Sequence, residues 1–253
     1  MRKMTPNAFT NRLRTPRCSA FPAPRSPFQN AFTRTEALAL LAILSLLLAI
    51  VLPALAHDRA RSSRIICANN LRQIGAGFQL WSNDHGELPP WEITPANGGT
   101  MMHSLGANAW LHFSWISNEL RTARVLLCPS DTGNLAEDFG FSSTGYLNAN
   151  NRNTSTSYFL SHAFNGGQSV VFVGDRNIPG ASTSCSRFPQ VTSVSATSNF
   201  GWDGNLHNQS GNVARFDGRV HQYSNNELRD ALRSDPISDR NPDLSAIHFL
   251  KPR

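Results

Sequence analysis

The feature that most constrains this chain is an uncharged apolar run from Ala37 to Ala56. The run has 20 residues, and Ser45 is its one hydroxyl-bearing side chain. A helix of about 20 residues extends about 30 Å, which is the thickness of the hydrocarbon core of a membrane. A core helix of a soluble domain keeps a polar face, whereas this run has none. We therefore predict a membrane-spanning helix at residues 32–56 rather than a buried core helix.

The basic residues are concentrated just before this run. Six of the 23 basic residues lie in residues 1–31, which contain no acidic residue, and this leaves 17 basic and 17 acidic residues in 32–253. The formal net charge of +6 therefore comes entirely from residues 1–31, and no nucleic-acid partner is expected. Basic residues before a span indicate a cytoplasmic N-terminus and a C-terminal part outside the cytoplasm.

The run also fits the apolar core of a cleaved secretory signal. Residues 54–56, Ala-Leu-Ala, form a small-x-small pattern after the helix breaker Pro53, and cleavage there would release a soluble protein beginning at His57. The alternative is cleavage before the run, which would keep the run as an anchor. The long basic leader at residues 1–31 favours the anchor.

A helical pattern continues beyond the apolar run. Apolar residues follow at spacings of 4, 3, 4 and 3, namely Cys67, Leu71, Ile74, Phe78 and Trp81. These spacings place all of them on one face of a helix. We predict one helix of about 50 residues, membrane-spanning at 32–56, amphipathic at 57–85, and kinked at Pro53.

Residues 31–36, Ala-Phe-Thr-Arg-Thr-Glu, resemble the prepilin processing site of type IV pilins and type II secretion pseudopilins. In that family a prepilin peptidase cuts before a phenylalanine and methylates the new N-terminus, and a glutamate is the fifth mature residue. The resemblance implies cleavage between Ala31 and Phe32, with Glu36 in the glutamate position and Pro53 in the position of the kink. Ala31 stands where the family usually has glycine.

The resemblance also implies a role for Glu36. A carboxylate at the edge of a membrane span is costly to leave unpaired. In a bundle of such helices Glu36 would pair with the α-amine of the neighbouring subunit and set the register of assembly. The alternative is that Glu36 only marks the interfacial end of the span.

Further motifs resemble a pseudopilin-like group of bacterial proteins. They are Cys-Ala-Asn-Asn-Leu-Arg-Gln-Ile-Gly at 67–75, Cys128-Pro-Ser-Asp, and His207 followed after nine residues by Asp217-Gly218. The implied protein is a single-pass inner-membrane subunit of a type II secretion or type IV pilus-like fibre. Its implied partners are the inner membrane, prepilin peptidase and other pseudopilin subunits.

The remaining residues, 86–253, are expected to form a periplasmic α+β domain in which a small antiparallel sheet packs on the long helix. Residues 169–173 predict a strand buried on both faces, 212–223 a hairpin with Asp217-Gly218 as a two-residue turn, and 226–233 a short helix.

Three other segments have weaker patterns. Residues 133–157 are expected to be an exposed loop with little to pack, and the tail after Pro236 is expected to be irregular. Residues 110–120 fit a strand or a short helix equally.

No catalytic motif is present in the sequence, and we expect no enzymatic activity. A triad of His207, Ser210 and Asp217 is conceivable, but these residues are close in sequence and fall in turns. Calcium is the one cofactor that the sequence suggests, with Asp175, Asp203 and Asp217 as ligands near strand ends. The alternative is that these aspartates only form turns.

Three cysteines remain after loss of the leader, which contains Cys18. Cys67, Cys128 and Cys185 would face an oxidising compartment, and an odd number allows one intramolecular disulfide at most. Cys67 lies on the face that packs against the domain, so Cys67–Cys128 is the preferred pair. Buried free thiols are the alternative.

These observations favour a pseudopilin-like protein that acts by assembly. A different class of function is also open, namely an anchored or secreted periplasmic domain that binds a ligand such as a carbohydrate. That alternative depends on a surface rich in tryptophan, formed by Trp91, Trp110, Trp115 and Trp202.

Overall fold

The computed structural model describes residues 33–101, 103, 108–162, 172–179, 184–185, 188–195, 200–234, 246–250 and 252. The chain divides into two compact units, with the boundary between Val51 and Leu52. The predicted α+β class is confirmed, because a long N-terminal helix is followed by an antiparallel sheet with shorter helices.

The long helix, α1, runs from Arg34 to Asn83 and contains Pro53. Thr33 and Glu36 close its first turn reciprocally. The backbone N–H of Thr33 donates to the Glu36 carboxylate at 2.9 Å, and the backbone N–H of Glu36 donates to the Thr33 hydroxyl at 3.3 Å. This capping box explains why the helix begins at Arg34.

The first part of α1 is apolar on all sides. The large aliphatic side chains from Leu38 to Leu55 are 47–65% exposed. This helix is long and apolar enough to cross a membrane.

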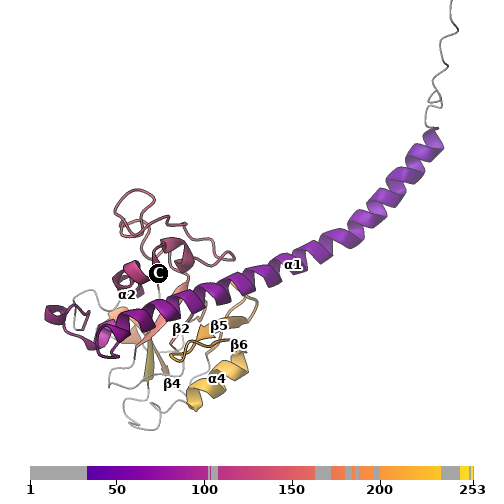
Figure 1. The fold of residues 1–253 in the computed structure, drawn as a ribbon. Helices are drawn as coiled ribbons and strands as arrows, with labels where there is room; N and C mark the ends of the chain where they lie inside the picture. Colours follow the sequence, from indigo (N-terminus) through magenta and orange to yellow (C-terminus); the bar gives the residue numbers. More distant parts are fainter. Residues whose placement is uncertain are drawn as a thin grey trace, which may run out of the picture. The chain divides into compact units, whose positions relative to one another are not determined.

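The rest of α1 belongs to the second unit and is buried on one face. Cys67, Leu71, Ile74 and Phe78 are completely buried, and Trp81 is 6% exposed. These are the residues whose spacing predicted one apolar face. They join the main hydrophobic core of the second unit, where α1 crosses the strands (Figure 1).

Short helices connect α1 to the sheet. They are the 3-10 helices η1 (Pro90–Glu92), η2 (Pro95–Asn97) and η3 (Ala123–Leu126), and the α-helices α2 (Ala109–Trp115) and α3 (Ser117–Leu120). Residues 110–120, which fit either a strand or a helix by pattern, are therefore mainly helical. Helix α4 (Asn225–Arg233) follows the last hairpin, as predicted for residues 226–233.

The sheet has seven strands, and every neighbouring pair is antiparallel. The strands are β1 (Tyr158–His162), β2 (Val173–Asp175), β3 (Ser184–Cys185), β4 (Phe188–Ser195), β5 (Ser210–Ala214), β6 (Val220–Ser224) and β7 (Ala246–Leu250). Their order is β3-β4-β7-β1-β2-β5-β6. The C-terminal strand thus lies inside the sheet.

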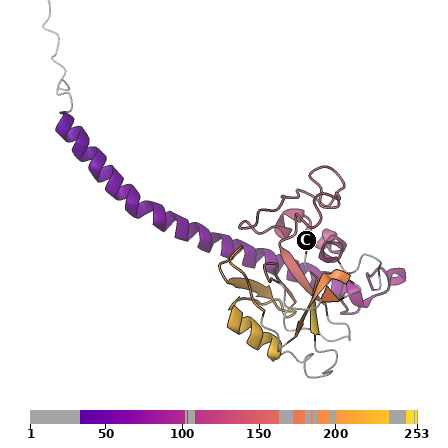
Figure 2. The same ribbon diagram turned by 180° about the vertical axis from the view of Figure 1, so that it is seen from behind.

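The two faces of the sheet support separate cores. Tyr158 and Leu160 of β1 point into the core shared with α1, whereas Phe159 packs with Leu228 and other residues in a second core that includes α4. This alternation is the period of two expected for a strand. The strands therefore lie between α1 and α4, an arrangement that the opposite view also shows (Figure 2).

Two predictions about loops are wrong. The tail after Pro236 is not wholly irregular, because β7 pairs with both β1 and β4. Residues 133–157 pack well: Tyr146 is completely buried and its hydroxyl lies 2.7 Å from Thr156 Oγ1. The Asn151 side chain donates to the carbonyls of Ser143 and Gly145, so an asparagine supplies the hydrogen bonds that secondary structure would otherwise provide.

The hairpin of β5 and β6 forms, but its turn is longer than two residues. Gly218 N–H donates to the Arg215 carbonyl, and Arg215 N–H donates to the Arg219 carbonyl, so residues 216–218 form the tip. Gly218 has a φ of 80°, which favours glycine. Of the strand predicted at 169–173, Val173 opens β2, and residues 169–171 lie outside the described part.

Two glycines provide a test of this packing. A Cβ at Gly75 in α1 would meet nothing within 4 Å, whereas a Cβ at Gly211 in β5 would overlap the indole of Trp202. Gly75→Ala should raise the free energy of unfolding by about 0.5–1 kcal/mol, since alanine favours a helix interior. Gly211→Ala should lower it by about 1–3 kcal/mol through overpacking. Chemical denaturation of the full chain in detergent measures both, and equal effects of the two variants would contradict this packing.

Candidate functional site around the Cys67–Cys128 disulfide

The Cys67–Cys128 disulfide joins the buried face of α1 to the segment after η3. The two residues are 61 positions apart, and both side chains are completely buried. The pair preferred from the sequence is thus the pair present in the structure. Closing a loop of this length restricts the unfolded chain and stabilises the fold by about 4 kcal/mol in the chain-entropy account.

His207 packs directly against this disulfide. Its ring Nε2 lies 3.5 Å from Cys128 Sγ and 3.5 Å from Asp175 Oδ2, and the residue is 3% exposed. The backbone carbonyl of His207 accepts hydrogen bonds from Arg64 of α1 at 2.6 Å and from the Ser210 hydroxyl at 2.6 Å. Both the ring and the backbone of His207 are therefore fixed.

Asp175, the last residue of β2, completes the cluster from within the sheet. Its Oδ2 accepts hydrogen bonds from the backbone N–H and the side-chain amide of Asn212 at 2.6 and 3.1 Å. Its Oδ1 is buried and has no hydrogen-bond partner among the described residues. Asp175 thus links the disulfide site to the neighbouring strand β5.

Burial shifts both titratable groups toward their neutral forms. Loss of solvent raises the pKa of Asp175 to about 7, although the hydrogen bonds from Asn212 oppose this shift. Loss of solvent, together with the positive charge of Arg64, lowers the pKa of His207 to about 4. Around pH 7 the imidazole is therefore neutral, and any charge of the pair belongs to Asp175.

A second set of hydrogen bonds extends the cluster through the Cys-Pro-Ser-Asp motif. The backbone N–H of Cys128 donates to the Ser157 hydroxyl at 2.9 Å, and that hydroxyl donates to Asp131 at 2.7 Å. Asp131 also forms an ion pair with Arg176 at 2.7 Å. The motif thus joins the start of β1 to the residue that follows β2.

The cluster contains the residue types of a metal site, but with the two cysteines oxidised to a disulfide it cannot bind a metal through them. The side-chain donor atoms of Cys67, Cys128 and His207 lie within 4.8 Å of one another. A metal requires thiolates, and both sulfurs are consumed by the disulfide. The arrangement fits a structural role in which a histidine fills the space beside a buried disulfide.

The residues predicted to bind calcium do not form one site. Asp175 lies in the buried cluster, and Asp203 lies in a loop where it accepts hydrogen bonds from Asn205. Asp217 lies at the hairpin tip, with Arg215 at 4.0 Å and Arg219 at 3.9 Å. Among the described residues, these three aspartates do not gather into a cluster that could hold a metal.

The His-x9-Asp-Gly element is divided between two places in the structure. His207 lies at the disulfide, whereas Asp217 and Gly218 shape the hairpin tip, where Gln79 of α1 donates to the Phe216 carbonyl at 2.8 Å. The conceivable triad is not assembled, because Ser210 bonds to the His207 backbone and the His207 ring faces Asp175. Each end of the element contacts α1 at a different level.

Some residues of this site were not identified from the sequence. Arg64 and Gln79 are not among the apolar residues whose spacing predicted the buried face of α1, yet both donate to the domain. Arg64 lies three residues before Cys67, so the helical period could have placed its side chain beside the disulfide. No local pattern indicates the pairing of Asp175 with Asn212.

The predicted tryptophan surface is wrong. Trp91 and Trp110 are each 7% exposed and Trp202 is 3% exposed, so all three belong to the cores. Trp115 is partly buried, and its indole N–H donates to the Gly98 carbonyl at 2.7 Å. The carbohydrate-binding alternative therefore loses the surface on which it depended.

Most of the second unit is similar to a known protein family. A family model named SBP_bac_10 and described as "Protein of unknown function (DUF1559)" matches residues 58–233. The matched region contains Cys67, Cys128, His207 and the β5–β6 hairpin. Searches of curated proteins and of solved structures returned no match.

The opposite pKa shifts of Asp175 and His207 predict a specific pH dependence of stability. The pKa of Asp175 rises from 3.8 to about 7 on folding, so its contribution is present below about pH 4 and is lost as pH rises through 7. The pKa of His207 falls from 6.5 to about 4, so its contribution is present above about pH 6.5 and is lost as pH falls through 4. Between about pH 4 and 6.5, a rise in pH therefore reduces the contribution of Asp175 to the free energy of unfolding and increases that of His207.

Single variants separate the two slopes. In Asp175→Asn, the free energy of unfolding should rise more steeply with pH than in the wild type between about pH 4 and 6.5. In His207→Asn, the free energy of unfolding should fall with pH over the same range. Guanidinium titrations of the oxidised protein at several pH values measure these slopes. Wild-type slopes in both variants would refute the assignment.

Proposed function

This chain belongs to the DUF1559 family, and we propose that it is a pseudopilin-like subunit that is cut by prepilin peptidase and assembles through α1. The mature protein would be a single-pass inner-membrane protein with a cytoplasmic N-terminus and a periplasmic C-terminal domain. It would join other pseudopilin subunits in a type II secretion or type IV pilus-like fibre. Its role would be assembly and not catalysis.

The observation that carries this proposal is the change of character along α1. One helix presents exposed aliphatic side chains before about residue 56 and buries one face in the domain after Cys67. An exposed apolar surface of that size needs a membrane or other helices to cover it. A helix that is apolar first and domain-bound second supplies both an anchor and a packing surface for neighbouring subunits.

The start of α1 supports the proposed processing site. Cleavage between Ala31 and Phe32 would place the new amine one residue before Thr33, which caps the helix together with Glu36. Because the capping box uses the Oε2 atom of Glu36, the Oε1 atom stays available for a second partner. Glu36 could therefore cap its own helix and pair with the α-amine of a neighbouring subunit.

The first test concerns processing. When the gene is expressed with a prepilin peptidase, the mature chain should begin with N-methylated Phe32, because the cleavage site lies between the basic leader and the apolar run. Intact-mass and N-terminal analysis of membrane fractions measures this. Ala31→Leu, which replaces the small residue before the cut, serves as the unprocessed control. A mature chain beginning at His57 would replace the proposal with a simple secretory signal.

The second test concerns Glu36 in assembly. Glu36→Gln keeps a side chain that can close the capping box but removes the charge that would pair with an α-amine. It should reduce subunit cross-linking by tenfold or more without reducing membrane insertion, since a charge-assisted hydrogen bond is about twice as strong as a neutral one. Cysteine cross-linking between neighbouring subunits in membranes measures this.

Thr33→Ala is the matched control for this test. It removes the hydroxyl that caps the N–H of Glu36 but leaves the Glu36 charge in place. Cross-linking of Thr33→Ala should resemble that of the wild type. Normal cross-linking of Glu36→Gln would mean that the glutamate only marks where the membrane begins.

A further inference from the structure

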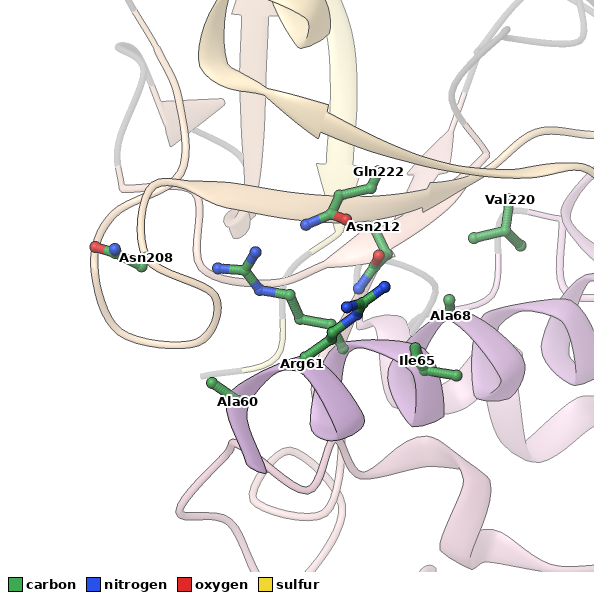
Figure 3. A pocket seen from close by; sticks show the side chains of 9 residues that line it. Ala60, Arg61, Ile65, Ala68, Asn208, Asn212, Val220 and Gln222 are labelled. Carbon is green, nitrogen blue, oxygen red and sulfur yellow. The ribbon is translucent and has the colours of Figure 1, made fainter. Parts of the chain in front are cut away.

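A groove separates α1 from the β5–β6 hairpin on the solvent side of the second unit (Figure 3). Its volume is about 780 Å³. The α1 wall carries Arg61, Arg64 and small apolar residues, and the opposite wall carries Asn208, Asn212 and Gln222. In the close-up view the Arg61 and Gln222 side chains extend into the space between the helix and the hairpin (Figure 3).

The groove is positively charged. Two arginines line it, and no acidic residue does. Arg64 donates to the His207 carbonyl, so its position is fixed by the cluster described above. Arg61 has no hydrogen bond or ion pair with any residue that the structure describes. A fixed guanidinium and an unpaired one therefore face the same space, which is suited to an anionic group.

The remaining lining makes the groove amphiphilic. Ala60, Ile65, Ala68 and Val220 provide apolar surface. Asn208 and Gln222 are exposed amides that can donate hydrogen bonds to a phosphate or an ester oxygen. A ligand with an anionic head and an adjoining apolar part matches both kinds of surface.

The position of the groove along α1 identifies the source of such a ligand. The apolar run ends at Ala56, and Arg61 follows five residues later, about 7.5 Å further along the helix. The polar headgroup layer extends about 5–7 Å beyond each side of the hydrocarbon core. The Arg61 guanidinium therefore reaches the level of lipid phosphates if the run spans the membrane.

We propose that this groove binds the headgroup phosphate of an anionic phospholipid, with Arg61 as the main contact and Arg64 as the second. The lipid site rests on the membrane anchoring in the proposed function. A general attraction to polyanions is not the cause, because residues 32–253 carry equal numbers of basic and acidic residues. Bound lipid would fill the space between the helix and the hairpin at the membrane surface.

Arg59 provides the matched control for this proposal. It lies two residues before Arg61 on the same helix, is exposed and carries the same charge, but does not line the groove. Arg59→Ala and Arg61→Ala therefore remove the same charge at nearly the same depth. Arg61 makes no contact that folding requires, so both variants should unfold at the wild-type temperature in neutral bilayers.

The experiment uses the full chain in nanodiscs of phosphatidylcholine with or without phosphatidylglycerol. Native mass spectrometry counts phosphatidylglycerol molecules retained on the protein, and thermal unfolding measures the stabilisation. Retention by Arg61→Ala should fall about fivefold or more, the factor that corresponds to about 1 kcal/mol per basic residue at a membrane surface. Arg59→Ala should retain most of the wild-type lipid. An equal loss in both variants would overturn the groove proposal and leave only surface attraction.

Two further outcomes distinguish a lipid site from a free-anion site and from a failure of the anchor. If inorganic phosphate stabilises the protein in phosphatidylcholine nanodiscs as much as phosphatidylglycerol does, the groove is a free-anion site and the lipid proposal is overturned. If the wild type does not enter nanodiscs of any composition, the membrane anchoring of the proposed function fails, and the lipid proposal fails with it. If the protein enters nanodiscs but Arg61→Ala retains as much phosphatidylglycerol as the wild type, the lipid proposal alone is overturned.

Discussion

The disulfide between Cys67 and Cys128 is the constraint on which the second unit depends. An amphipathic helix is marginal in water by itself and obtains its stability from the face that it buries. The disulfide fixes that face of α1 to the segment before β1. The His207 ring packs against Cys128 Sγ, and Asp175 in turn contacts the His207 ring. One buried point therefore sets the positions of α1, the end of β2 and the loop before β5.

The sequence predicted the features that depend on local periodicity. The spacing from Cys67 to Trp81 identified the buried face of α1 because side chains three and four positions apart lie on one side of a helix. The same face placed Cys67 toward the domain, which made Cys128 its preferred partner. The short helix after the hairpin was also predicted, and its capping box between Ser224 and Glu227 is a local signal of the same kind.

The features that the sequence did not predict depend on contacts between distant segments. β7 occupies an interior position because its backbone pairs with both β1 and β4, and its own residues do not reveal those partners. Asp175 resembles an ordinary turn residue until Asn212 is placed beside it. Tyr146 anchors a segment whose composition alone suggests an exposed loop. In each of these three places, hydrogen bonds between separate segments of the chain determine the structure.

The second part of α1 is attached to the rest of the second unit at several levels, and this has a mechanical consequence for the proposed fibre. Arg64, Cys67 and Gln79 contact the domain through a hydrogen bond, a disulfide and a second hydrogen bond. These contacts are distributed over about 22 Å of helix, given a rise of 1.5 Å per residue. Sliding of this part of the helix against the rest of the second unit would break these contacts, one of which is covalent. A displacement of residues 64–79 of the helix during assembly of the proposed fibre would therefore move the rest of the second unit with it.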